Sequence, residues 1–70
     1  MEPREAVLRV LDDEGGGPLH WTVVQDLALR RGYLDPFTQP DVRKHVLTAL
    51  AEAASDGAVV KDDTGTYRLP

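Results

Sequence analysis

The sequence predicts an α+β fold of the winged helix-turn-helix class, in which three helices pack on a small three-stranded antiparallel sheet. Three stretches with helical apolar spacing come first, and a C-terminal stretch with the alternation of a β-hairpin follows them. A short extended stretch at residues 19–21 precedes the second helical stretch. We expect it to pair with the hairpin, because an isolated hairpin is only marginally stable. With 70 residues, the chain forms a single domain, residues 1–70.

The first helix is expected over residues 2–14. Val7, Val10 and Leu11 lie at i, i+3 and i+4, which places them on one narrow apolar stripe. The run Gly15–Gly17 ends the helix, because consecutive glycines favour a turn or loop.

The second helix is expected to begin at Thr22, which forms a capping box with Gln25 three residues later. Gly32 is suited to the left-handed position just after its end. The residues expected to face inward are Val23 or Val24, Leu27 and Ala28.

The third helix is expected from about Pro40 to Ser55, with Thr38 as a second plausible cap. On a helical wheel, one face collects the apolar residues Val42, Val46, Ala49, Leu50 and Ala53. The hairpin follows as strands 58–61 and 66–69, joined by the turn-forming residues 62–65.

Composition excludes several classes of function. The chain contains no cysteine, which rules out disulfides and thiolate metal sites and fits a reducing cytoplasm. No apolar run approaches the ~18 residues that span a bilayer, and the charged N-terminus is unlike a signal peptide. We therefore expect a cytoplasmic protein with no membrane partner. The net charge of −4 counts against nucleic-acid binding, because phosphate neutralisation supplies most of that affinity.

Catalytic and metal sites find no support in the sequence. The two histidines, His20 and His45, lie far apart and lack the spacing of a metal site. The carboxylate clusters lie at a helix end and a turn tip, with no nucleophile and base arranged together. We expect no enzyme activity, no cofactor and no small-molecule substrate. Trp21, beside His20, is interpreted as an aromatic that closes the core.

Several motifs resemble the HARE-type helix-turn-helix family of winged helices. They are Pro18-Leu19-His20-Trp21, Leu27-Ala28 with Arg31-Gly32-Tyr33-Leu34, Thr38-Gln39-Pro40-Asp41 and Gly65-Thr66-Tyr67-Arg68-Leu69. The chain is also similar to the N-terminal domain of the bacterial RNA polymerase delta subunit. The resemblance implies a winged-helix module without catalytic residues that binds nucleic acid or works in transcription.

The predicted DNA-binding residues lie on the third helix and the wing. In a winged helix the third helix enters the major groove, and the wing contacts the backbone or minor groove. We expect Lys44 and Thr48 to face the groove, while Arg43, Lys61 and Arg68 meet phosphate. Gln39 is expected at the helix N-terminus, where backbone amides favour phosphate. The candidate residues are Gln39, Arg43, Lys44, Thr48, Lys61 and Arg68.

Weak binding to double-stranded DNA, in a transcription- or genome-associated role, is the first interpretation. Two alternatives stay open on the sequence. In the first alternative, the domain is a protein-interaction module that docks on RNA polymerase or another nucleic-acid machine, and its acidic surface steers it toward a basic partner. In the second alternative, it is a non-catalytic domain of a larger enzyme. If the domain does not bind DNA, the candidate basic residues are ordinary solubilising charges.

Overall fold

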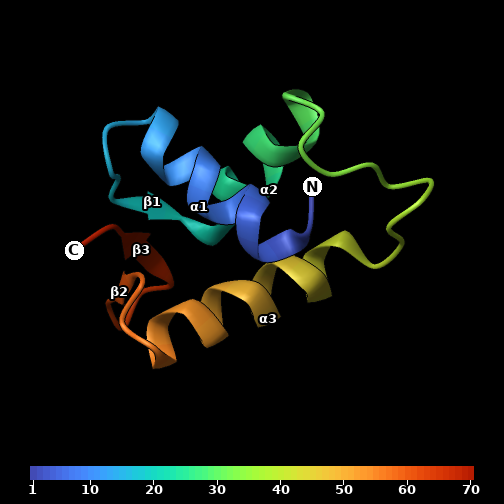
Figure 1. The fold of residues 1–70 in the computed structure, drawn as a ribbon. Coiled ribbons are helices and arrows are strands. Elements are labelled where there is room, and N and C mark those ends of the chain that lie inside the picture. Colours follow the sequence, from blue (N-terminus) through green and yellow to red (C-terminus); the bar gives the residue numbers. More distant parts are fainter.

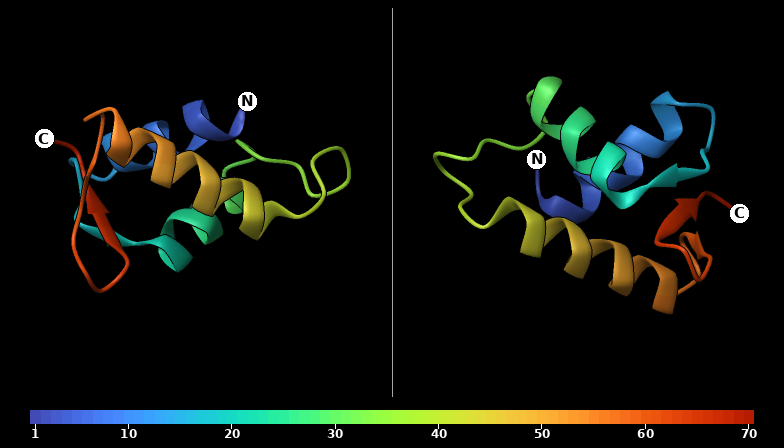
Figure 2. Two further views of the ribbon diagram at one scale, coloured as in Figure 1. Left: turned by 90° about the horizontal axis from the view of Figure 1, so that it is seen from below. Right: turned by 180° about the vertical axis from the view of Figure 1, so that it is seen from behind.

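A computed structural model describes all 70 residues as three helices and a three-stranded sheet, consistent with the predicted winged-helix layout. The helices lie side by side, with the strands gathered at one end and the α2–α3 loop at the other (Figure 1, Figure 2). The elements in chain order are α1 (Pro3–Asp13), β1 (Leu19–His20), α2 (Trp21–Arg30), α3 (Val42–Ser55), β2 (Val60–Lys61) and β3 (Thr66–Arg68).

The sheet is antiparallel with strand order β1-β3-β2, which confirms that residues near 19 pair with the C-terminal hairpin. Tyr67 in the central strand lies opposite Leu19 of β1 on one side and Lys61 of β2 on the other. The strands are shorter than expected, covering residues 60–61 and 66–68 of the hairpin. Trp21 belongs to α2 and not to the first strand.

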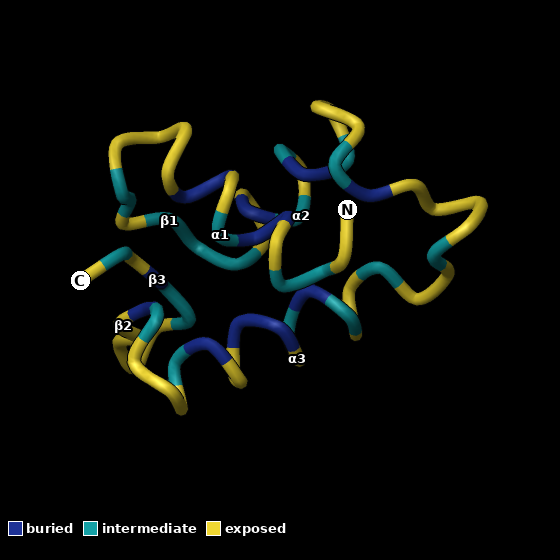
Figure 3. Tube along the Cα trace, viewed as in Figure 1, coloured by how far each residue is buried: buried dark blue, intermediate teal, exposed yellow.

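The core is wholly apolar and lies where the three helices meet the sheet (Figure 3). Val24, and not Val23, is the buried valine of α2, since Val23 remains 41% exposed. Leu27 is only half-buried. The 13 buried residues are Ala6, Val7, Val10, Leu11, Val24, Ala28, Leu34, Val46, Ala49, Leu50, Ala53, Val59 and Tyr67.

The predicted Thr22 cap of α2 is wrong, because the helix begins one residue before it. His20 is the N-cap, and its Nδ1 accepts a hydrogen bond from the Thr22 backbone N–H at 3.3 Å. The backbone N–H of Trp21 donates to the Gly65 carbonyl at 3.0 Å. Strand pairing thus extends to His20 and fixes where the helix starts.

Gly32 follows the end of α2 as expected, and its φ of 72° lies in the left-handed region. The Gly32 N–H donates to the Leu29 carbonyl at 3.2 Å, and the Tyr33 N–H donates to the Ala28 carbonyl at 2.9 Å. These two bonds form a Schellman motif and satisfy carbonyls at the helix end. The chain then turns so that Leu34 enters the core, 2% exposed.

The predicted start of α3 at Pro40, capped by Thr38, is also wrong. The helix begins at Val42, and Asp41 precedes it in a left-handed conformation (φ 56°) without a side-chain cap. The preceding residues instead form a turn centred on Asp35, whose carbonyl accepts from the Thr38 and Gln39 N–H groups at 3.2 and 2.8 Å. Because the backbone N–H groups of Thr38 and Gln39 bond to Asp35 in this turn, these residues do not form the start of the helix.

A polar latch joins the end of α1 to the segment after α2. The Tyr33 hydroxyl donates to Asp13 Oδ2, and Arg31 Nη1 lies 3.4 Å from the same oxygen. The bond from Tyr33, aided by the charges of Arg9 and Arg31, lowers the pKa of Asp13 below its usual range. The same bond, with desolvation, raises the pKa of Tyr33.

We predict that Gly65→Ala destabilises the fold more than Gly57→Ala. Both glycines have similar left-handed φ angles, 82° and 86°, so the conformational cost is matched. A Cβ on Gly65 would lie 3.2 Å from His20 Nε2 and 3.2 Å from Trp21 Cδ1, whereas one on Gly57 meets nothing within 4 Å. Urea unfolding should give a difference of about 1 kcal/mol or more, as for other overpacked sites. Equal losses would show that the wing does not press on Trp21.

We predict that the latch stabilises the fold near neutral pH and that this contribution is lost at both acidic and alkaline pH. A lowered pKa at Asp13 stabilises the fold above about pH 4, and this contribution is lost as pH falls through the folded pKa. A raised pKa at Tyr33 stabilises it below about pH 10, and this is lost as pH rises through the folded pKa. Tyr33→Phe should flatten the pH dependence of the unfolding free energy in both windows.

The control for the latch is Asp12→Asn, which removes the neighbouring exposed carboxylate. It should leave the loss of unfolding free energy at alkaline pH unchanged. If Tyr33→Phe shows the same alkaline loss as the native protein, the latch does not contribute to stability.

Candidate nucleic-acid interface

The cations of the chain divide into a paired and an unpaired group. Each arginine of the first 35 residues faces a carboxylate: Arg4 lies 2.7 Å from Asp56, Arg9 3.5 Å from Asp13, Arg30 2.9 Å from Asp26 and Arg31 3.4 Å from Asp13. The remaining cations form no ion pair, and they are Arg43, Lys44, Lys61 and Arg68. All four are exposed. The basic side chains without an ion pair therefore all lie on α3 and the hairpin.

Arg43 lies over the ring of Trp21. Its guanidinium carbon lies 5.4 Å from the centroid of the Trp21 ring, within the range of a cation–π contact. Trp21 is half-buried and packs against the core, as expected of an aromatic that closes it. Trp21 thus has a second role, because its ring also contacts the guanidinium of Arg43 on α3.

The same tryptophan borders the wing. A Cβ on Gly65 would lie 3.2 Å from Trp21 Cδ1, and the His20 and Trp21 rings are 5.7 Å apart. Trp21 therefore connects the first turn of α3 with the turn between β2 and β3. No local motif reveals this contact, because Trp21 and Arg43 lie 22 positions apart in the sequence.

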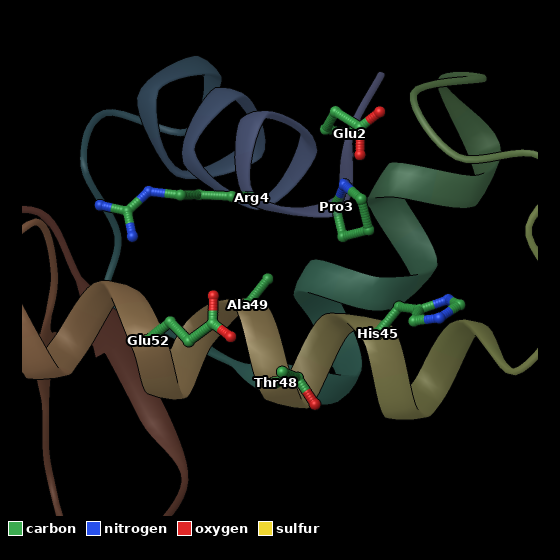
Figure 4. A pocket seen from close by; sticks show the side chains of 7 residues that line it. All are labelled: Glu2, Pro3, Arg4, His45, Thr48, Ala49 and Glu52. Atoms are coloured by element: carbon green, nitrogen blue, oxygen red, sulfur yellow. The ribbon is translucent and has the colours of Figure 1, made fainter.

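Lys44 and Thr48 are both exposed on α3, one turn apart, as the helical wheel predicts. Thr48 lies at the rim of a cavity of about 230 Å³ between α1 and α3, beside His45 (Figure 4). Glu2 and Glu52 line the same cavity. Arg4 lines it as well, so Thr48 borders a part of the surface with both acidic and basic side chains, whereas Lys44 does not line the cavity.

The two cations of the wing lie on opposite faces of the hairpin. Directly paired residues of an antiparallel ladder point to the same face, and successive residues alternate. Lys61 pairs with Tyr67 and so shares the face that packs on the helices, whereas Arg68 pairs with Val60. Arg68 Nη1 also donates to the Leu69 carbonyl at 3.2 Å. Lys61 is therefore the wing cation on the helix side.

The tip of the wing is acidic. Asp62 Oδ1 accepts from the Thr64 hydroxyl at 2.7 Å, the Thr64 N–H at 2.9 Å and the Thr66 N–H at 3.0 Å. These bonds lower the pKa of Asp62, with the Thr64 side chain the largest cause. The carboxylate stays charged beside Asp63, so the tip disfavours contact with phosphate.

The expected position of Gln39 at the N-terminus of α3 is wrong, because the helix starts at Val42. Its amide instead joins two backbone segments, with Nε2 donating to the Met1 carbonyl at 2.9 Å and Oε1 accepting from the Asp35 N–H at 3.1 Å. Gln39 therefore stabilises the loop, and its amide group is already hydrogen-bonded.

Searches of protein-family models, curated proteins and solved structures found no match to this chain. None of the helices has the length and apolar character needed to cross a membrane.

We predict that Arg43→Ala exposes Trp21 to solvent. The chain has a single tryptophan, so its fluorescence reports on this site alone. Acrylamide quenching should increase, and the unfolding free energy should fall by about 0.5–1 kcal/mol, the value of an exposed cation–π contact. Lys44→Ala, one residue away, should change neither. Identical quenching in the two variants would mean that Arg43 does not cover the indole.

Proposed function

We propose that this domain binds double-stranded DNA weakly through α3 and the wing, in a transcription- or genome-associated role. One observation carries the proposal: every arginine of the first 35 residues is neutralised by a carboxylate, whereas Arg43, Lys44, Lys61 and Arg68 are not. Phosphates bind best where cations need not first leave an internal partner.

The placement of these cations agrees with winged-helix docking. Arg43 and Lys44 lie in the first turn of α3, the part of the recognition helix that contacts DNA in helix-turn-helix proteins. Lys61 lies on the helix side of the wing. The contact with Trp21 orders the Arg43 side chain before binding, which reduces the entropy lost when it meets phosphate.

The charge distribution predicts weak affinity. Four free cations give a salt slope no steeper than about −4, because each phosphate neutralised on B-DNA contributes about −0.9. Only Lys44 is a cation on the outer face of α3, beside Thr48, Ala51 and Ser55. This face offers few groups for base-specific hydrogen bonds, so we expect little sequence preference.

The proposal is tested by adding a short DNA duplex to the isotope-labelled protein at low salt. Backbone amides of residues 42–48 and 60–68 should shift. Lys44→Gln should weaken binding several-fold and reduce the salt slope by about 0.9, since one phosphate contact is lost.

The matched control is Arg30→Gln, which removes the same charge from an exposed pair with Asp26. It should leave the salt slope unchanged. No shift at millimolar protein, or equal effects of the two variants, would contradict binding through α3.

A further inference from the structure

Phe37 is the most exposed large apolar side chain of the protein. It lies in the α2–α3 loop (residues 31–41) and is 95% exposed. The other exposed large apolar residues, Met1, Val23 and Val60, retain between 40% and 43% exposure. A phenylalanine fully in water forgoes the burial that an aromatic of this size normally obtains.

The α2–α3 loop holds this side chain in a defined position. Asp35 Oδ1 accepts from the Phe37 N–H at 2.9 Å, and the Asp35 carbonyl accepts from the Gln39 N–H at 2.8 Å. Gln39 returns two side-chain hydrogen bonds, to the Asp35 N–H and to the Met1 carbonyl. The loop is therefore tied both to itself and to the N-terminal segment, and Phe37 is displayed at its surface.

The loop segment that carries Phe37 has acidic side chains and no basic ones. Residues 34–41 contain Asp35 and Asp41 and no basic side chain, and the Met1 ammonium donates to the Tyr33 carbonyl just before this segment. Both aspartates are exposed, and neither forms an ion pair. An apolar side chain with two carboxylates near it in the sequence, neither of them in an ion pair, fits a surface that is apolar at its centre and basic at its rim. A second copy of this chain, with net charge −4, is disfavoured by the same charges.

We propose that the α2–α3 loop is a docking site that packs Phe37 against an apolar surface flanked by lysine or arginine residues on a partner protein. The loop extends from the end of the molecule opposite the β2–β3 hairpin (Figure 1, Figure 2). A partner on this loop leaves the wing uncovered. The inference does not depend on DNA binding, because it uses none of the four free cations.

The test uses synthetic amphipathic helical peptides added to the full chain at low salt. One peptide has leucines on one face and lysines on the other, and its counterpart carries glutamates in place of the lysines. The leucine–lysine peptide should shift the amides of residues 34–41 and the Phe37 ring resonances. Phe37→Ser should weaken its binding at least about tenfold, as for aromatic anchors at other interfaces.

Two further variants separate the anchor from general charge attraction. Val60→Ser removes an exposed apolar side chain on the wing and should leave peptide binding unchanged. Asp35→Asn with Asp41→Asn removes both charges, while Asn retains the oxygen that accepts from Phe37 and tolerates the left-handed conformation of residue 41. This double variant should bind the leucine–lysine peptide several-fold more weakly and with less salt dependence.

Several results would overturn the proposal. These are equal binding of the leucine–lysine peptide by the native chain and Phe37→Ser, shifts confined to other residues, or tighter binding of the leucine–glutamate peptide. Dimerisation of the native chain that Phe37→Ser abolishes would also overturn it, because a second copy would then occupy the loop. Weaker DNA binding in Lys44→Gln, with peptide binding intact, would show that the two sites are separate.

Discussion

The burial of Tyr67 in the central strand is the contact on which the arrangement of the surface depends. Tyr67 is 4% exposed and lies between Leu19 of β1 and Lys61 of β2. It is the one buried residue of the sheet, so it joins the C-terminal hairpin to the helical core. Because β1 pairs with β3, the start of α2 is drawn against the wing, and Trp21 comes to lie beside Gly65.

This constraint also organises the charge. With Trp21 fixed between the wing and α3, Arg43 finds an aromatic surface and no carboxylate. The N-terminal arginines are instead neutralised by neighbouring acids, as when Arg4 pairs with Asp56 after the end of α3. The protein is acidic overall, yet its unpaired basic side chains all belong to α3 and the hairpin. Net charge is therefore a poor guide to this surface, because pairing decides which charges remain available.

Helix starts could not be read from local motifs alone. Thr22 and Thr38 both have the residue type of a cap, but each is overruled by a contact outside the motif. At Thr22 the competing contact is strand pairing up to His20, and at Thr38 it is the turn centred on Asp35. The displacement of α3 by two residues removed Gln39 from the helix N-terminus and left it bound to Met1 and Asp35.

The amino-acid sequence by itself determined the order of the elements, the apolar face of α3, the pairing of residue 19 with the hairpin and the glycine that ends α2. The order, the apolar face and the glycine follow from periodicity and backbone preference, which act over a few residues, and the pairing follows from the marginal stability of an isolated hairpin. Only the tertiary structure decided which cations are free, which face of the wing Lys61 occupies and how far Phe37 protrudes. Those properties depend on contacts between residues distant in the chain, such as Arg43 with Trp21, and no local pattern encodes them.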